Sequence, residues 1–407
     1  MTVDDMSELR GRLATLAEEA VPTAGYAEVR QRAGRLRRRR VAALASSALV
    51  VALGIGVAGH GALPGLGGGN DTALGALPAG DPGRLASCPA RKLPLPTGVR
   101  SVLVNAADPT GRYVVGDTTE PDASGGRLPA HPILWDRGVP RLIAGASGSA
   151  VAVNSHGVVV GENTGTNTSL PIPLSGSAWI FQNGKVSALA PPAGYTSAFV
   201  SGLNDGGDVV GYVSGKNSPL TVPVVWKAGG PARVLAVPGS LDSVLLRGIA
   251  DDGTIVGDVS RVGGNVVYTW DERGNARMLP APAGYPGGDA STAINGSWVA
   301  GYARKEPAGD QTAVRWNLLT GAVTAYPGMA VFAQINAKGV AVAQVVGPDG
   351  KGHEADLADG GRVISLPAAT KGTAVAMSVN DDNSAVAGYF YVHGTEVGTP
   401  VVWSCRD

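Results

Sequence analysis

The residues of this 407-residue chain that could carry chemistry are few, and they lie far apart. The two cysteines, Cys88 and Cys405, could form one disulfide bond if the protein is exported to an oxidising compartment. Four histidines follow residue 60 and none has a partner at metal-binding spacing: His131, His156, His353 and His393. The chain also has no Gly-x-Ser-x-Gly nucleophile motif. We therefore predict no catalytic residue, no metal site and no cofactor.

A sevenfold repeat between residue 98 and the C-terminus must position these residues. Each unit has a turn around Asn or Asp and Gly, a β-branched run that ends on Gly, a second run that ends on Trp, and a third that ends on Leu-Pro. The glycines recur every 43 to 50 residues, with Gln344 in the sixth position: Gly116, Gly161, Gly211, Gly257, Gly301 and Gly388. The tryptophans, with Asp356 in the sixth position, are Trp135, Trp179, Trp226, Trp270, Trp316 and Trp403. Such periods, built from four short strands, are typical of a β-propeller, so we predict an all-β, seven-bladed propeller over residues 88–407.

Each recurring residue type has a structural interpretation. We expect the glycine where a neighbouring blade or the following strand approaches too closely for a Cβ, and the tryptophan as a wedge between blades. A sugar-stacking platform is the alternative role for the tryptophans. The turns around Asn154, Asn204 and Asn336 follow type I turn chemistry, and a calcium site would need several converging carboxylates.

The two ends of the repeat region predict how the ring closes. Only four residues follow Trp403, so the seventh blade lacks its fourth strand, whereas residues 91–96 match the fourth strand of other units and precede the first blade. An N-terminal strand would therefore complete the last blade. Aligning the units places Cys88 and Cys405 within disulfide distance across that strand pair, which predicts a bond that locks the ring.

The region before the repeats predicts a membrane anchor. Residues 1–40 contain nine arginines, no lysine and six acidic residues, and they end on Arg37, Arg38, Arg39 and Arg40. An apolar run follows, and we predict a transmembrane helix at 41–62 and a Gly/Pro-rich linker at 63–87. The arginines predict a cytoplasmic N-terminus and an extracellular propeller. A cleaved signal peptide and twin-arginine export are the alternatives.

The repeat resembles the HAF family of extracellular repeat proteins, whose units read approximately A-x-x-I-N-D-x-G-x-V-V-G followed by H-A-F-L-W. The resemblance rests on LNDGGDVVGY (203–212), IADDGTIVGD (249–258), AINGSWVAGY (293–302) and HPILW (131–135). It implies a secreted or surface β-propeller without an established catalytic set. Residues 1–40, which contain a short amphipathic helix pattern, resemble the heads of membrane proteins found beside extracytoplasmic-function sigma factors in actinobacteria.

These observations favour a non-catalytic binding or sensing module in the cell membrane. Its ligand is expected at one end of the central channel, near loops around Tyr113, Tyr212, Tyr302 and Tyr389. Two alternatives remain open, namely an anti-sigma-type regulator that signals through residues 1–40 and an extracytoplasmic hydrolase or lyase. The formal net charge is zero, so we expect no nucleic-acid partner. The expected partners are the membrane, an extracytoplasmic ligand or protein, and a cytoplasmic regulator if the head signals.

Overall fold

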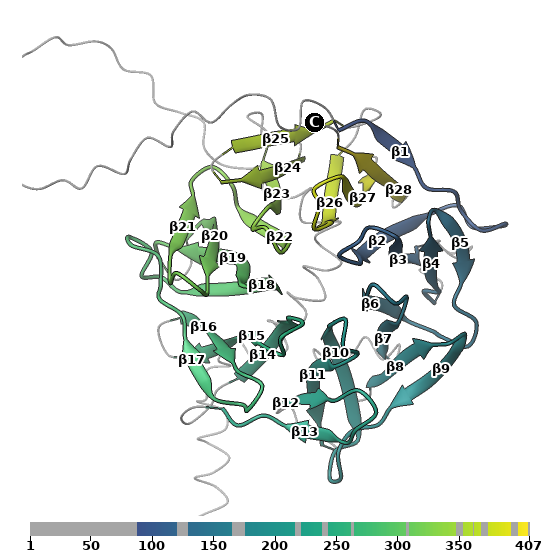
Figure 1. Ribbon diagram of the computed structural model, residues 1–407, viewed down its shortest axis with the longest axis horizontal. Helices are drawn as coiled ribbons and strands as arrows, with labels where there is room; N and C mark the ends of the chain where they lie inside the picture. Colours follow the sequence, from purple (N-terminus) through teal and green to yellow (C-terminus); the bar gives the residue numbers. More distant parts are fainter. Residues whose placement is uncertain are drawn as a thin grey trace, which may run out of the picture.

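The computed structural model describes residues 88–119, 129–164, 176–215, 221–237, 243–261, 264–306, 309–346, 353–360, 362–367, 373–391 and 398–405. They form seven four-stranded antiparallel sheets around a common axis, as Figure 1 shows. The prediction of an all-β, seven-bladed propeller is confirmed. The predicted head, span and linker lie outside these residues. Within the described ranges, no helix is long and apolar enough to cross a membrane.

Each blade runs from an innermost strand near the axis to an outermost strand on the rim. Blade 1 contains β2 (Val102–Ala107), β3 (Tyr113–Thr118), β4 (Pro132–Asp136) and β5 (Val139–Leu142). Blade 2 contains β6 (Ser149–Val153), β7 (Val159–Thr164), β8 (Gly176–Gln182) and β9 (Lys185–Leu189). Blade 3 contains β10 (Ser197–Leu203), β11 (Val209–Ser214), β12 (Thr221–Trp226) and β13 (Ala232–Val234). Blade 4 contains β14 (Ser243–Ile249), β15 (Ile255–Arg261), β16 (Gly264–Trp270) and β17 (Ala276–Met278).

The remaining blades follow the same plan. Blade 5 contains β18 (Asp289–Asn295), β19 (Trp298–Arg304), β20 (Gln311–Asn317) and β21 (Val323–Tyr326). Blade 6 contains β22 (Val331–Ile335), β23 (Ala341–Val346), β24 (His353–Asp359) and β25 (Arg362–Leu366), so the degenerate sixth unit still forms four strands. Blade 7 contains β26 (Thr373–Val379), β27 (Ala385–Tyr391), β28 (Gly398–Ser404) and, from the other end of the propeller sequence, β1 (Ala90–Lys92).

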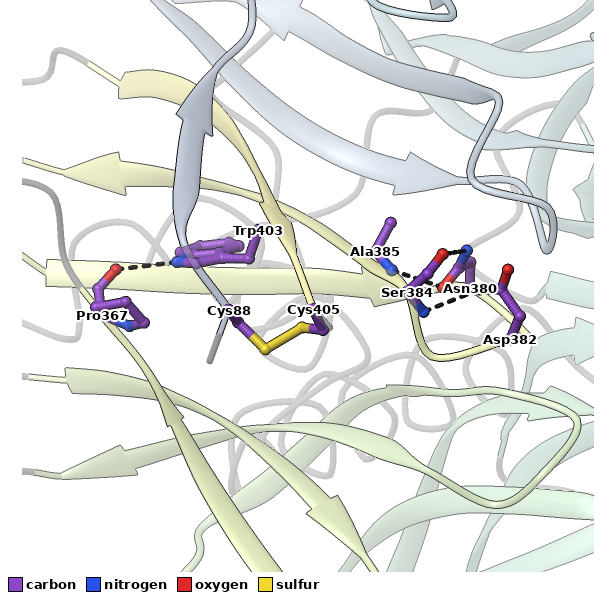
Figure 2. Close-up of a disulfide and its surroundings, with 8 residues drawn as sticks. All are labelled: Cys88, Pro367, Asn380, Asp382, Ser384, Ala385, Trp403 and Cys405. Atoms are coloured by element: carbon purple, nitrogen blue, oxygen red, sulfur yellow. Dashed lines mark hydrogen bonds between the residues drawn. A yellow bond between two sulfur atoms is a disulfide. The ribbon is translucent and has the colours of Figure 1, made fainter. Parts of the chain in front are cut away.

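The ring closes through β1 and a disulfide bond. Strand β1 pairs antiparallel with β28, with Ala90 opposite Trp403. Figure 2 shows the bond between Cys88 and Cys405, which lie 317 residues apart in sequence and 4.1 Å apart between Cα atoms. Both cysteines are buried. The closing strand and the disulfide therefore lie where the repeat alignment predicts them, and they cover an otherwise open edge of β28.

The hydrophobic core is divided among the joints between blades. Seven clusters of buried residues are present in the described part of the chain, and each combines residues from two adjacent blades. A second strand such as β11 is buried along its whole length. This burial explains why these strands have nearly continuous apolar sequences rather than an alternating pattern.

Each repeated tryptophan joins its blade to the preceding one. The indole N–H of Trp226 donates to the Ala190 carbonyl at 2.8 Å, and that of Trp403 donates to the Pro367 carbonyl at 2.9 Å. Equivalent bonds start from Trp135, Trp179, Trp270 and Trp316, and all six acceptors follow the outermost strand of the blade before. The rings thus fill the joints, and their buried N–H groups are satisfied.

The strand register corrects the expected tryptophan position in two units. In most blades the tryptophan of the third strand pairs with the residue two positions before the glycine of the second strand. In blade 3, for example, Trp226 pairs with Val209, two positions before Gly211. In blade 2 that place is taken by Phe181, because Trp179 pairs directly with Gly161. In blade 6 it is taken by Ala358, so the alignment of Asp356 with the tryptophans is wrong by two residues.

Aromatic residues compensate for the missing tryptophan of blade 6. Ala341, Ala343 and Ala358 of blade 6 belong to one buried cluster with Tyr326 of blade 5 and Phe332 of β22. The two rings meet edge to face with their centroids 5.0 Å apart. The joint between blades 5 and 6 is therefore filled by residues outside the repeat position, which preserves close packing.

Candidate functional site

Every innermost strand carries a β-bulge at the same place. The register against the second strand shifts by one residue, for example between Val200 and Gly202 of β10. The seven extra residues, which we call the bulge ring, are Asn105, Val151, Ser201, Arg247, Thr292, Ala333 and Met377. Bulges redirect side chains and occur frequently near functional sites.

The bulge explains why the second strand of most blades has a glycine at the repeated position. A Cβ atom added to Gly211 would collide with the carbonyl oxygen of Phe199, two residues before the bulge in the preceding strand. The same carbonyl position blocks a Cβ in the other five glycines of the series. The close approach shared by all six glycines therefore comes from the preceding strand of the same blade. The expected approach of the following strand is present as well at Gly161, beside Trp179, and at Gly388, beside Trp403. In blade 6 the corresponding residue is Ala343, opposite Phe332, so the assignment of Gln344 is wrong by one position.

The bulge ring differs in every blade. All seven residues are half-buried, and each directly follows a buried residue on the strand that borders the axis. Ser201, Arg247 and Thr292 form a polar arc on blades 3 to 5, whereas Ala333 and Met377 form an apolar arc on blades 6 and 7. The repeated Gly and Trp positions are alike in most blades and support the common fold. The bulge-ring position differs from one blade to the next.

Arg247 belongs to a charged cluster at the joint between blades 4 and 5. Its Nε donates to Asp258 Oδ2 at 2.7 Å, and Asp258 Oδ1 accepts the backbone N–H and the hydroxyl of Ser291, each at 2.7 Å. Asp258 is buried, which strengthens these charge-assisted bonds. A second buried carboxylate, Asp289, lies close enough to interact with it electrostatically.

Asp289 of this cluster has a perturbed pKa. Burial, together with the negative charge of Asp258, raises the pKa of the Asp289 carboxyl to about 6. Asp258 accepts hydrogen bonds from the Arg247 guanidinium and from the backbone N–H and hydroxyl of Ser291. A carboxyl whose pKa lies near neutrality can exchange protons with a bound molecule.

Blade 1 repeats this arrangement without the arginine. Asn105 donates to Asp117 and to the Ala150 carbonyl, and the Ala150 N–H donates to Asp117 Oδ1 at 2.9 Å. Asp117 and Asp258 both directly follow a strand-two glycine and both bind the backbone of the next blade. An acidic residue after that glycine is thus the sequence signal that could have revealed these sites.

The asparagine turns form a second ring at the ends of the innermost strands. Asn154 Nδ2 donates to the Asn204 carbonyl at 3.1 Å, and Asn204 Nδ2 donates to the Ala250 carbonyl at 3.1 Å. Across blades 6 and 7, Asn336 Nδ2 donates to the Asn380 carbonyl at 2.8 Å. In Figure 2 Asn380 also binds the backbone N–H of Ala385 within its own turn. These residues therefore connect neighbouring blades, a role that turn chemistry alone does not predict.

Carboxylates at the next turn position bring negative charge toward the axis. Asp205 accepts the Ser155 N–H, and Asp381 accepts both the Ala337 N–H and the Asn295 amide. Burial raises the pKa of Asp381, and the charges of Asp251 and Asp205 add to this effect. Acidic side chains from blades 3, 4 and 7 thus influence one another electrostatically, but the described residues contain no group of three His, Cys, Asp or Glu that could hold a metal ion.

The predicted tyrosine positions belong mainly to the blade joints. Tyr113 and Tyr389 are buried in joint clusters, and Tyr212 stacks on Phe199 with a centroid distance of 5.0 Å. Tyr302 is half-buried beside Arg304. The strands therefore hold these rings in packing positions, and sequence reasoning missed the bulge ring and the carboxylate pair.

Comparison with known proteins identifies the fold class. No protein-family model matches the chain, and no curated protein matches its sequence. The chain is similar in structure to the β-propeller domain of the Trilobed protease from Pyrococcus furiosus, with a TM-score of 0.52 at 11% identity over 75% of this chain and 96% of that one. It is also similar to oligogalacturonate lyase in complex with manganese, with a TM-score of 0.53 at 12% identity over 80% of this chain and 95% of that one.

A third similar structure is the Pyrococcus horikoshii acylaminoacyl peptidase. Its TM-score is 0.51 at 11% identity, over 75% of this chain and 52% of that one. At these identities the likeness defines a seven-bladed β-propeller and assigns no activity. The protease domain is described as having an open velcro topology, whereas here β1 and the disulfide close the ring.

Proposed function

We propose that this protein is a membrane-anchored, extracytoplasmic propeller that binds its ligand at the axis without transforming it. The observation that carries this proposal is the bulge ring, in which seven equivalent positions present different side chains inside a repeated frame. Recognition of one ligand requires such asymmetry, because a uniform ring could not fix the orientation of a molecule.

The composition of the bulge ring indicates a ligand with two different faces. The polar arc at Ser201, Arg247 and Thr292 offers hydrogen-bonding groups, and the apolar arc at Ala333 and Met377 offers hydrophobic contact. A peptide or glycan segment with one polar and one apolar side has this chemistry.

The binding proposal can be tested by photocrosslinking on membranes from cells that express the full chain. A photoreactive amino acid at Met377 is expected to capture the ligand, and the same residue at the rim position Ala276 is not. Capture that is equal at both positions, or that occurs only at Ala276, would refute binding at the axis.

Anchoring is supported by the apolar run at 41–62, the arginines that precede it and the linker that follows. Protease added to intact cells is expected to digest the chain beyond residue 62. Protection of that region would refute the topology. Capture of a sigma factor by the full-length protein, and not by a variant that lacks residues 1–36, would support the regulatory alternative.

The carboxylate pair supports a second candidate function, a hydrolase or lyase. Asp289, whose pKa is about 6, lies beside the buried Asp258, which accepts a hydrogen bond from Arg247 of the bulge ring. This pattern suits acid–base catalysis. Turnover of a peptide or uronate oligomer that is lost in an Asp289→Asn variant of unchanged stability would establish an enzyme, whereas retained turnover in that variant would exclude this carboxylate pair as the catalytic site.

A further inference from the structure

Exposed positive charge is concentrated on the rim where the described chain enters the propeller. We define the basic rim as Arg91 and Lys92 of β1 together with Arg137, Val139, Arg141 and Leu142 of the β4–β5 hairpin. All six residues are exposed, and the two apolar side chains retain 69% and 47% of their accessible surface. Cations flanking exposed aliphatic side chains form a surface with both charge and hydrophobic character.

These residues form one continuous surface across blades 7 and 1. A Cβ at Gly138, the tip of the β4–β5 hairpin, would lie 3.7 Å from both terminal nitrogens of Arg91. Strands β1 and β5 lie side by side on the rim in Figure 1. The hydrogen bond from Arg112 lowers the pKa of the Asp136 carboxyl, and Arg137 and Arg141 are close enough to add to this effect.

Among the described residues of β1 and the β4–β5 hairpin, the surface has a net positive charge because the carboxylate of Asp136 is already paired. Arg112 Nε binds Asp136 Oδ1 at 2.8 Å. The charges of Arg112 and Asp136 cancel each other. The four cations of the basic rim therefore outnumber the acidic residues among the described residues of β1 and the β4–β5 hairpin.

The outer hairpins of blades 3 to 5 carry fewer unbalanced cations. In blade 3, Lys227 is paired with Asp208, so Arg233 remains. In blade 4, Arg273 and Arg277 are balanced by Asp271 and Glu272 within the same hairpin. A basic residue on the outermost strand recurs in most blades and protects the strand edge. The basic rim differs because four such cations from blades 7 and 1 lie together on one surface.

We propose that the basic rim rests on the anionic headgroups of the membrane that carries the N-terminal anchor. The proposal rests on the anchoring part of the proposed function. The linker predicted at 63–87 directly precedes β1 in sequence. A Gly-rich chain of that length would span on the order of 25 to 30 Å on a random-coil model, so the rim that carries β1 would lie within reach of an anchoring bilayer.

The chemistry of the rim matches that surface. Arginine and lysine side chains bind lipid phosphates, and Val139 and Leu142 can enter the boundary between headgroups and acyl chains. Contact through the rim places the propeller axis roughly parallel to the membrane plane. Both ends of the channel then stay accessible to a ligand, which would not hold if the propeller lay on one of its flat faces.

The test uses the full chain inserted into nanodiscs of phosphatidylcholine alone or with added phosphatidylglycerol. Hydrogen–deuterium exchange is measured for peptides that cover 89–93 and 136–143. We expect slower exchange there in the discs that contain the anionic lipid, and loss of this difference at high salt. Replacing Lys92 and Arg137 by glutamine is expected to weaken the contact by roughly 25-fold, from about fivefold per cation.

A matched double variant, Arg273→Gln with Arg277→Gln on blade 4, serves as the control and is expected to behave as the unmodified protein. Equal exchange in both kinds of disc, or equal effects of the two double variants, would overturn the rim contact while leaving the anchor intact. Protein that does not insert into either disc would instead refute the anchor, and with it the basis of this proposal.

Discussion

Replacement of Asn336 by alanine tests whether the asparagine turns connect the blades. Asn336 is fully buried, and its Oδ1 accepts the backbone N–H groups of Lys338 at 3.1 Å and Val340 at 2.9 Å. Its Nδ2 donates to the Asn380 carbonyl at 2.8 Å and to Asn383 Oδ1 at 2.6 Å. Alanine leaves these four groups without this partner.

The expected loss of stability follows from the burial of those groups. An unsatisfied buried polar group costs about 1 to 3 kcal/mol, and solvent can reach some of the four, so we expect a total loss of about 3 kcal/mol. Urea unfolding followed by tryptophan fluorescence measures this change. Asn275→Ala is the matched control, because Asn275 binds Asp271 on an exposed hairpin and should cost less than about 0.5 kcal/mol.

The Asn336→Asp variant separates the two halves of the argument. Its carboxylate would keep both accepted bonds but would place a second oxygen against the Asn380 carbonyl, which raises the pKa of the new carboxyl in the folded protein. The variant should therefore be closest to the unmodified protein below the unfolded pKa and lose stability as the pH rises. If Asn336→Ala costs no more than Asn275→Ala, the connection between blades is refuted.

Three further predictions concern closure, the bulge and the buried carboxylate. Replacing Cys405 by serine should lower stability by up to about 6 kcal/mol on the entropic model, measured as the urea midpoint against that of the oxidised protein, and the variant should match the reduced unmodified protein. Gly211→Ala should cost about 3 kcal/mol or more because the Phe199 carbonyl occupies the Cβ position, whereas Gly229→Ala at an open hairpin should cost about 1 kcal/mol from its positive φ. A raised folded pKa favours folding below pH 3.8, and that contribution is lost as the pH rises through about 6. Unmodified protein should therefore lose about 2.4 kcal/mol between pH 4 and 7 relative to Asp289→Asn. Equal pH profiles of the two proteins would contradict the assigned pKa.

In the degenerate sixth unit, the repeat pattern of the sequence is not sufficient to predict the strand register. Its alignment by apolar pattern misplaced Gln344 and Asp356, because small residues match several registers equally well. The structure selects one register through contacts with Tyr326 of the preceding blade, which lies outside the repeated positions. Such compensation depends on volumes from two blades, and a single unit does not encode it.

Motif reasoning could reach only part of the candidate site: the acidic residue after the strand-two glycine is visible in the sequence, but its partners are not. Asp258 and Ser291 are 33 residues apart and belong to different blades, so no local spacing brings them together. The bulge at Arg247 is a register shift between two strands. The predicted tyrosines were visible in the sequence, but burial in the joints decides their role.

The sequence alone determined the number of blades, the closing strand and the partner of each cysteine. These features follow from hydrophobic runs, turn residues and a fixed period, which act locally and repeat along the chain. The tertiary structure decided which residue of each innermost strand forms the bulge, how the asparagine turns link neighbouring blades and where the cations of the rim come together. Those features arise from residues that become neighbours only when the blades pack around the ring, where strand register and burial set the energies.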